Sequence, residues 1–444
     1  MFYVLVSIFI IQFFQKQHYW KILLFTSLLF FIILSREGFI LILYIALLTY
    51  YFSLNINKIK QLKLWMIGLI LLPLLFKKVF ISEYQFDDFI FPVRSVNKLI
   101  NVIGLSYITF NAIGYLVDIK RKYTVPQTNF FKLLLYLTYF PIIFSGPLTR
   151  AKHFFSEMEN IKLKRSSIIN GLRLILWGVF KNLVVGARLF SLMLALIKMN
   201  LSGPYYLLNG FVFFLFLYVT FSSFINIFQG ISLIFNIQIN DNFRNRIYLS
   251  ASREEFWKGW HITLNQWFRD YFFYEIVRHD KKRKYTNLLL FFTFLGIALW
   301  HDFTLVYLTW GVLNAIWLIA ERKYKKKVNI KNRFSFLGII YHLIIASFLA
   351  TIFISNNIFE VFNTLFNFSK QNYTFENLLI PNTYILILTF AFMDLYERKT
   401  TSIRIDKYLE KQNIWHRFFF YYMLIFLILS FAISPKIVNY YNLF

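Results

Sequence analysis

Residues 205–236 read YYLLNGFVFFLFLYVTFSSFINIFQGISLIFN and contain no charged side chain. An apolar run of about 18 or more residues is long enough to cross the hydrocarbon core of a bilayer as a helix. Comparable or shorter apolar runs recur on both sides of this stretch, at 1–14, 21–35, 38–54, 65–81, 97–117, 131–147, 168–200, 286–320, 337–356, 380–396 and 416–434. They lack the alternation of barrel strands, so we predict an all-α, polytopic integral membrane protein with roughly 10–13 membrane-embedded helices.

The composition supports this class and excludes several others. The chain of 444 residues is 58% hydrophobic and 16% charged, and it contains no cysteine. Disulfides, thiolate catalysis and cysteine-ligated metals are therefore excluded. The net charge of +27 comes from Lys and Arg that lie almost entirely between the apolar runs, which is the pattern of cytoplasmic loops. We expect the lipid bilayer, and not nucleic acid, as the partner of these charges.

The charge of the connecting segments predicts their side of the membrane. The strongly basic segment 119–132 is expected in the cytoplasm, whereas 82–95, with two Asp and one Glu against a single Arg, is expected outside. The segment 357–379 is also poor in positive charge, and we expect an outer loop that lies against the membrane.

A charged and aromatic segment, 249–275, interrupts the apolar pattern with LSASREEFWKGWHITLNQWFRDYFFYE. As a helix, it would place Phe256, Trp260 and Trp267 on neighbouring turns, with His261 and Asn265 one step around. Such a helix suits a half-buried layer at the membrane surface. The alternative is an interfacial amphipathic helix whose tryptophans anchor at headgroups and whose charges are solvated.

A His–Asp step, His301-Asp302, lies within the apolar run 286–320. Ionisable groups at membrane depth are costly and mark a pathway or a site. A neutral imidazole can accept a proton from a hydroxyl near neutral pH, which suits a general base. The alternative is that His301 lies at a helix end and caps a turn, and Asp302 either orients the ring or sits in water.

The remaining histidines lie near predicted loops or ends of apolar runs, without a partner at the spacing of metal ligands. We assign no metal site to them: His18, His153, His279, His342 and His416.

The charged and aromatic segment 249–275 and the His301-Asp302 step together resemble the membrane-bound O-acyltransferase family, in its bacterial polysaccharide branch. The stretch from Arg253 to Tyr271 is similar to that branch's signature of Phe-Trp, Trp-His, Trp and Arg-Asp-Tyr, and Leu299-Trp-His301 resembles the family's Leu-Trp-His. Three further segments fit the family pattern, namely 105–118, 139–147 and 234–243. Asp302 departs from the family, which usually has Gly after this histidine, so an inactive scaffold stays an alternative.

The resemblance implies a single transmembrane acyltransferase domain over 1–444, with helices around a central funnel. Its parts would be peripheral helices (1–95), a catalytic core (96–330) and C-terminal helices (331–444) that include the outer loop 357–379. It implies that His301 is the general base on an acceptor hydroxyl and that His261 holds or polarises the acyl donor. Residues implied to line the channel or substrate are Trp260, Asn265, Arg269, Asp270, Trp300 and Asp302.

The resemblance also implies the reaction partners. We expect acetyl transfer from a cytoplasmic thioester, acetyl-CoA or an acyl carrier protein, for O-acetylation of a cell-envelope polysaccharide, with no tightly bound cofactor. An exported esterase-like acceptor or glycan acetyltransferase is the expected partner, and the bacterial inner membrane the expected location. The basic loops 278–284 and 322–334 could steer an anionic donor. The alternatives are D-alanyl transfer from a carrier protein to teichoic acid and, in another class, a proton-coupled transporter or flippase.

Overall fold

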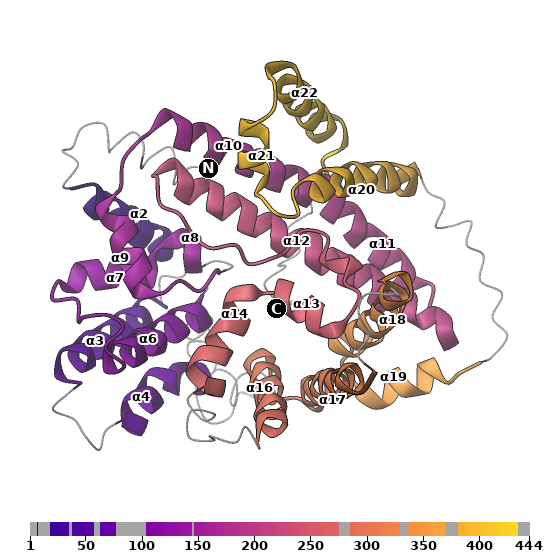
Figure 1. Cartoon of the computed structure of the whole chain (residues 1–444), viewed down its shortest axis with the longest axis horizontal. Coiled ribbons are helices and arrows are strands. Elements are labelled where there is room, and N and C mark those ends of the chain that lie inside the picture. Colours follow the sequence, from indigo (N-terminus) through magenta and orange to yellow (C-terminus); the bar gives the residue numbers. More distant parts are fainter. Residues whose placement is uncertain are drawn as a thin grey trace, which may run out of the picture. The chain divides into compact units, whose positions relative to one another are not determined.

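The computed structural model describes most of the chain as helices (Figure 1). The described residues are 7, 18–34, 38–56, 63–76, 104–143, 146–274, 285–328, 335–368 and 381–433. The segments 82–95 and 278–284 lie outside the described residues, as do 329–334 and 369–379 of the two longer loops.

The all-α class is confirmed, because the described residues contain α-, π- and 3₁₀-helices and no strand. Within them, four helices are long and apolar enough to cross a membrane: Arg165–Lys198, Gly203–Ile234, Phe336–Ile354 and Ile414–Phe431. Shorter apolar helices occupy Tyr19–Ile33, Phe39–Asn55 and Thr286–His301. The chain is therefore a polytopic membrane protein, and the funnel stays a prediction.

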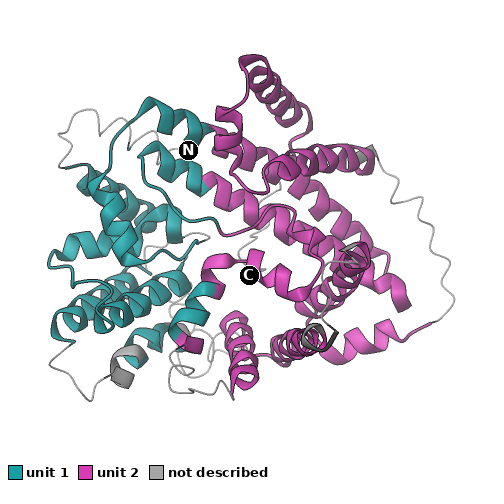
Figure 2. Ribbon diagram, in the orientation of Figure 1, with its two compact units in different colours: residues 1–172, 228–241, 266–271 teal, residues 173–227, 242–265, 272–444 magenta. Residues whose placement is uncertain are grey.

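The chain divides into two compact units, each built from separate segments (Figure 2). Unit 1 comprises Met1–Leu172, Phe228–Asp241 and Gln266–Tyr271. Its complete helices are α2 (Tyr19–Leu34), α3 (Phe39–Asn55), α4 (Lys63–Phe76), α6 (Leu105–Lys120), α7 (Phe130–Thr138), α8 (Phe140–Ile143) and α9 (Ala151–Glu159).

Unit 2 comprises Arg173–Ile227, Asn242–Asn265 and Phe272–Phe444. Helices divided between the units are α10 (Arg165–Phe180), α12 (Leu207–Ile234), α14 (Ile262–Trp267) and the π-helix Phe268–Phe273. The other elements of unit 2 are the π-helix Lys181–Gly186, α11 (Ala187–Lys198), the 3₁₀-helices Gly203–Tyr206 and Ile247–Leu249, α13 (Arg253–Gly259), α16 (Thr286–His301), α17 (Leu305–Val328), α18 (Ser335–Ile354), α19 (Ile358–Leu365), α20 (Pro381–Lys399), α21 (Ile405–Glu410) and α22 (Ile414–Phe431).

The apolar run 205–236 forms α12, and a glycine lets this helix approach a neighbouring helix. A Cβ on Gly210 would lie 2.0 Å from the backbone oxygen of Ser347 in α18. No real Cβ tolerates that distance, so only glycine permits this packing. Because α18 also carries residues of the candidate site, this contact helps to fix the site's position.

Two expected segments differ from the structure. The apolar run 286–320 is divided between α16 and α17, with a turn at Asp302–Thr304. The basic segment expected as a loop at 322–334 is helical through Val328, as the end of α17. Lys and Arg are good helix formers and are favoured near a helix C-terminus, so their charge did not mark a loop here.

Candidate functional site

His301 is the last residue of α16, and the chain turns directly after it into α17. Asp302 has extended backbone angles, φ −165° and ψ 164°, and its N–H bonds the carbonyl of Ala298. The two helices of this hairpin lie close together. A Cβ added to Gly311 would lie only 2.6 Å from the Cβ of Ala298, so the absence of a side chain at Gly311 permits this approach. The helix-end position that the sequence left open for His301 is therefore confirmed.

Aromatic side chains enclose the imidazole of His301, which is half-buried. The Tyr307 ring is nearly parallel to it at 5.7 Å between centroids, and Trp310 packs edge-on at 5.7 Å. Phe353 of α18 packs edge-on at 4.9 Å. The three rings come from α17 and α18, so two helices hold the imidazole in one orientation within a largely apolar wall.

A hydrogen bond within the turn accounts for the position of the Asp302 carboxylate. One of its carboxylate oxygens, Oδ1, accepts the backbone N–H of Phe303 at 2.9 Å. This bond satisfies a donor in the turn after α16, which is a usual role for Asp. The carboxylate therefore stabilises the turn that presents His301.

His261 lies in the same unit, and its ring and that of His301 both contact the indole of Trp300. The ring of Trp300 packs edge-on against His261 at 6.0 Å and lies 4.5 Å from the ring of His301. Phe221 of α12 packs edge-on against His261 at 5.1 Å. The two histidines found from the sequence are thus brought together around one tryptophan.

Burial controls the charge of His261. Its side chain is 4% exposed, and burial lowers its pKa from 6.5 to about 3. The charged form is disfavoured because the surrounding rings replace water as its environment. His261 is therefore neutral at physiological pH, so it can offer one N–H donor and one lone pair but no positive charge.

The helix expected over 249–275 is broken at His261, and this prediction was wrong. His261 has φ 45°, which is left-handed backbone, and α13 ends at Gly259 before α14 begins at Ile262. The backbone oxygen of Asn242 accepts the N–H of Ile262 at 2.9 Å. Its side-chain oxygen accepts the N–H of Thr263 at 3.0 Å, so a residue from outside the segment stabilises the break.

Asn265 holds the two sides of this break together. Its side-chain amide donates to the carbonyl of Trp257 at 3.1 Å and to that of Trp260 at 2.5 Å. Both carbonyls lie at the C-terminal end of α13, where the last carbonyls of a helix need partners from outside it. Asn265 thereby fixes the backbone that presents His261, which is a positioning contact.

Trp260 packs within the aromatic part of unit 2. Its ring stacks on Phe256 with centroids 5.3 Å apart, and Phe243 packs edge-on at 5.1 Å. Phe214 of α12 lies 6.1 Å away. This tryptophan thus joins α13 to α12 beside His261.

Arg269 and Asp270 belong to unit 1, whereas the other six predicted site residues belong to unit 2. Asp270 forms ion pairs with Arg150 and with Arg269, the latter at 2.9 Å. The next residue, Tyr271, donates its hydroxyl to Asp118 at 2.9 Å. The Arg-Asp-Tyr motif is thus anchored to α6 and to the loop before α9.

Burial and the neighbouring polar groups shift the pKa of the Asp118 carboxyl in opposite directions. Burial raises its pKa, and the Tyr271 hydroxyl and the guanidinium of Arg150 oppose that rise. Arg150 lies 3.9 Å from the carboxylate. These partners favour the ionised form of a carboxyl that is almost inaccessible to water.

Sequence reasoning missed a buried network around His342, a histidine that we expected near a loop or the end of an apolar run. His342 lies inside α18 with no exposed surface, and that expectation was wrong. A guanidinium nitrogen of Arg253 lies 3.5 Å from its Nδ1, and another donates to the side-chain oxygen of Asn314 at 2.8 Å. Glu321 accepts the backbone N–H of Arg253 at 2.8 Å. The network joins α13, α17 and α18 behind the aromatic rings.

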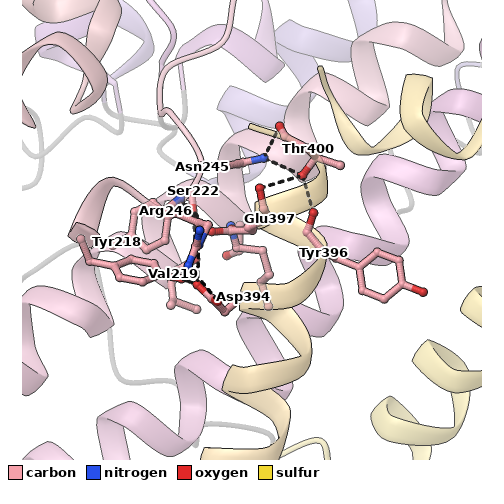
Figure 3. Close-up of polar contacts among 12 residues, drawn as sticks. Tyr218, Val219, Ser222, Asn245, Arg246, Asp394, Tyr396, Glu397 and Thr400 are labelled. Atoms are coloured by element: carbon pink, nitrogen blue, oxygen red, sulfur yellow. Dashed lines mark hydrogen bonds and ion pairs between the residues drawn. The ribbon is translucent and has the colours of Figure 1, made fainter. Parts of the chain in front are cut away.

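A second missed network centres on the ion pair between Lys181 and Glu397, at 2.7 Å. Their side chains are 1% and 0% exposed. Figure 3 shows Glu397 beside Tyr218 and Arg246, and the Tyr218 hydroxyl donates to Glu397 at 2.5 Å. Arg246 also pairs with Asp394, through Nε at 2.7 Å. A lysine inside the apolar run 168–200 was the signal, because a buried ammonium needs a partner.

Comparisons with known proteins agree with the motifs. The family model described as the membrane-bound O-acyltransferase family matches residues 80–360. The chain is 28% identical over 223 residues to a probable alginate O-acetylase of Pseudomonas aeruginosa, which covers 50% of this chain and 42% of that protein. It is 26% identical over 272 residues to a teichoic acid D-alanyltransferase of Bacillus subtilis, covering 58% and 67%.

A third relative is named for a different polysaccharide. A peptidoglycan O-acetyltransferase of Helicobacter pylori is 26% identical over 264 residues, covering 51% of this chain and 48% of that protein. The matches to the two acetylating relatives thus span less than half the length of those relatives.

Proposed function

Because the chain belongs to the membrane-bound O-acyltransferase family, we propose that it moves a short acyl group to a hydroxyl of a cell-envelope polysaccharide, with His301 as general base. The observation that carries the proposal is the pairing of His301 and His261 around Trp300. A general base must lie where its orientation is fixed and its imidazole can reach a hydroxyl. The aromatic enclosure of His301 meets the first condition.

The proposed reaction is acyl transfer from a thioester. His301 accepts the proton of the acceptor hydroxyl while the hydroxyl oxygen attacks the thioester carbonyl carbon. The new C–O bond forms, the C–S bond breaks, and the proton passes from the imidazolium to the departing thiolate. The products are an ester and a free thiol.

His261 has a different proposed role, because burial keeps its pKa at about 3 and its ring neutral. A neutral imidazole can donate its N–H to the thioester carbonyl oxygen, where negative charge develops during attack. The left-handed backbone and the bonds from Asn265 hold it for that role.

Acetyl is the proposed group, and acetyl-CoA or an acyl carrier thioester is the proposed cytoplasmic donor. The alginate and peptidoglycan O-acetyltransferases among the relatives support this choice. The relative named as a teichoic acid D-alanyltransferase supports D-alanyl transfer as the second candidate. In either case we propose a location in the bacterial inner membrane, with an exported esterase-like acceptor or an acyl carrier protein as partner.

The decisive experiment compares cells that carry the wild type, His301→Ala and a control, His153→Gln. His153 lies in α9 of unit 1, where Nε2 of its ring contacts the carbonyl of Gln238 at 3.1 Å. Base-labile acetate and D-alanine are measured on purified envelope polymers, and membrane levels of the protein are measured in parallel. We expect His301→Ala to lower one of the two acyl groups by a factor of about 100 or more, and the control to match wild type. Equal acylation in His301→Ala at equal protein levels would refute the proposal.

A further inference from the structure

Unit 1 contains a cavity that shares no residue with the site above. Its volume is about 410 Å³, within the usual range of small-molecule sites. The helices around it, α2, α7 and α9, lie together in Figure 1. The lining residues are Trp20, Lys132, Met158, Glu159, Asn160, Ile161 and Lys162.

The lining combines positive charge with an aromatic wall. The ammonium groups of Lys132 and Lys21 each lie 5.8 Å from the centre of the Trp20 ring. Lys162 adds a second lysine to the lining, and in the part of the chain that the structure describes neither Lys132 nor Lys162 forms an ion pair. Glu159 supplies one negative charge, so the lining carries a net positive charge.

Two residues of the lining lie at helix ends, where lipid headgroups are expected. Trp20 is the second residue of α2 and Lys132 the third of α7, so both lie at the ends of apolar helices. Tryptophan prefers the headgroup layer, and the basic segment 119–132 marks the cytoplasmic side. Met158 and Ile161, both buried, supply apolar contact in the same cavity.

We propose that this cavity binds the headgroup of an anionic phospholipid, with its phosphate held by Lys132 and Lys162 and its polar body against Trp20. Basic pockets between membrane helices on the cytoplasmic side suit this ligand. The acyl chains remain in the bilayer beside α2. This inference does not depend on acyl transfer, and its test measures binding without any activity.

The test uses the full-length protein in detergent, titrated with phosphatidylglycerol or with phosphatidylcholine of the same acyl chains. Retained lipid is counted by native mass spectrometry. We expect one phosphatidylglycerol to bind wild type more tightly than phosphatidylcholine does. Lys132→Gln with Lys162→Gln should weaken phosphatidylglycerol binding roughly thirtyfold, while Glu159→Gln should tighten it severalfold.

Opposite shifts from these two changes separate a charge effect from damage to the fold. The matched control is Lys122→Gln with Lys152→Gln, which removes two positive charges of unit 1 outside the cavity and should change binding less than threefold. Equal affinity for both lipids, or an equal loss in the control and the cavity variant, would overturn the proposal. Release of the bound lipid by excess soluble glycerol 1-phosphate would instead assign the cavity to a free phosphate ester and overturn the lipid assignment.

Discussion

Replacement of Lys181 by Met should destabilise unit 2 more than any surface change. The substitution keeps the length of the side chain and removes the ammonium that lies 2.7 Å from Glu397, leaving a carboxylate with no exposed surface. Tyr218 and the N–H of Arg246 still donate to its other oxygen. Breaking a buried ion pair from one side costs about 3–5 kcal/mol, because the remaining charge is uncompensated.

The assay is the free energy of unfolding in mixed micelles of a mild detergent and dodecyl sulfate, followed by tryptophan fluorescence. Trp177 is a local reporter, since its ring lies 6.1 Å from that of Tyr396. Glu397→Gln alone should lower the free energy of unfolding by a similar amount. The double variant should cost only about 1–2 kcal/mol, because no unpaired charge remains.

The control is the exposed pair of Lys407 and Glu410, at 3.1 Å, where Lys407→Met should cost less than about 0.5 kcal/mol. If Lys181→Met costs less than about 1 kcal/mol, or if the two single changes simply add in the double variant, the assignment of this ion pair as a stabilising lock is refuted.

Three further outcomes follow from the site. Asn265→Ala removes two hydrogen bonds at the break before His261 and should cost about 1–3 kcal/mol of unfolding free energy while lowering acyl incorporation, whereas an unchanged stability would contradict its positioning role. His261 binds protons less readily when folded (pKa about 3) than when unfolded (about 6.5), so stability should fall as pH falls within that window, by about 2 kcal/mol between pH 7 and pH 5. His261→Asn should lose that part of the pH slope, and an identical slope in unfolding titrations would count against the burial argument. Tyr271→Phe removes the hydroxyl that donates to the buried Asp118 and should cost about 1–3 kcal/mol, while Tyr274→Phe, at a half-exposed phenol, should be near neutral in the same titration.

Composition and apolar length predicted the helices well, because lipid leaves a long apolar segment few other conformations. The run at 205–236 became α12 at Leu207–Ile234, and the histidines of the two motifs met around Trp300. The positions of single helices could therefore be predicted from the local sequence pattern.

Contacts between residues far apart in the chain could not be predicted from the sequence. The segment around His261 has neither Pro nor a run of Gly at the break, and the carbonyl and side chain that stabilise the break come from Asn242. Lys181 and Glu397 are 216 residues apart in the chain. A lysine inside an apolar run predicts that a partner exists, but only the packing of the helices identifies that partner.

The hairpin of α16 and α17 also sets a depth for the chemistry. A helix of 16 residues is about 24 Å long, shorter than the roughly 30 Å of hydrocarbon in a bilayer. If α16 enters the membrane from the cytoplasm, as the basic residues before Thr286 in the sequence predict, the turn after His301 ends short of the opposite surface. Irregular backbone at that depth persists only where protein covers it or water reaches it. Under the proposed transfer from a cytoplasmic donor to an acceptor outside, the acceptor would then need to enter the membrane by only a few ångströms, while the acyl group would travel most of the bilayer's thickness.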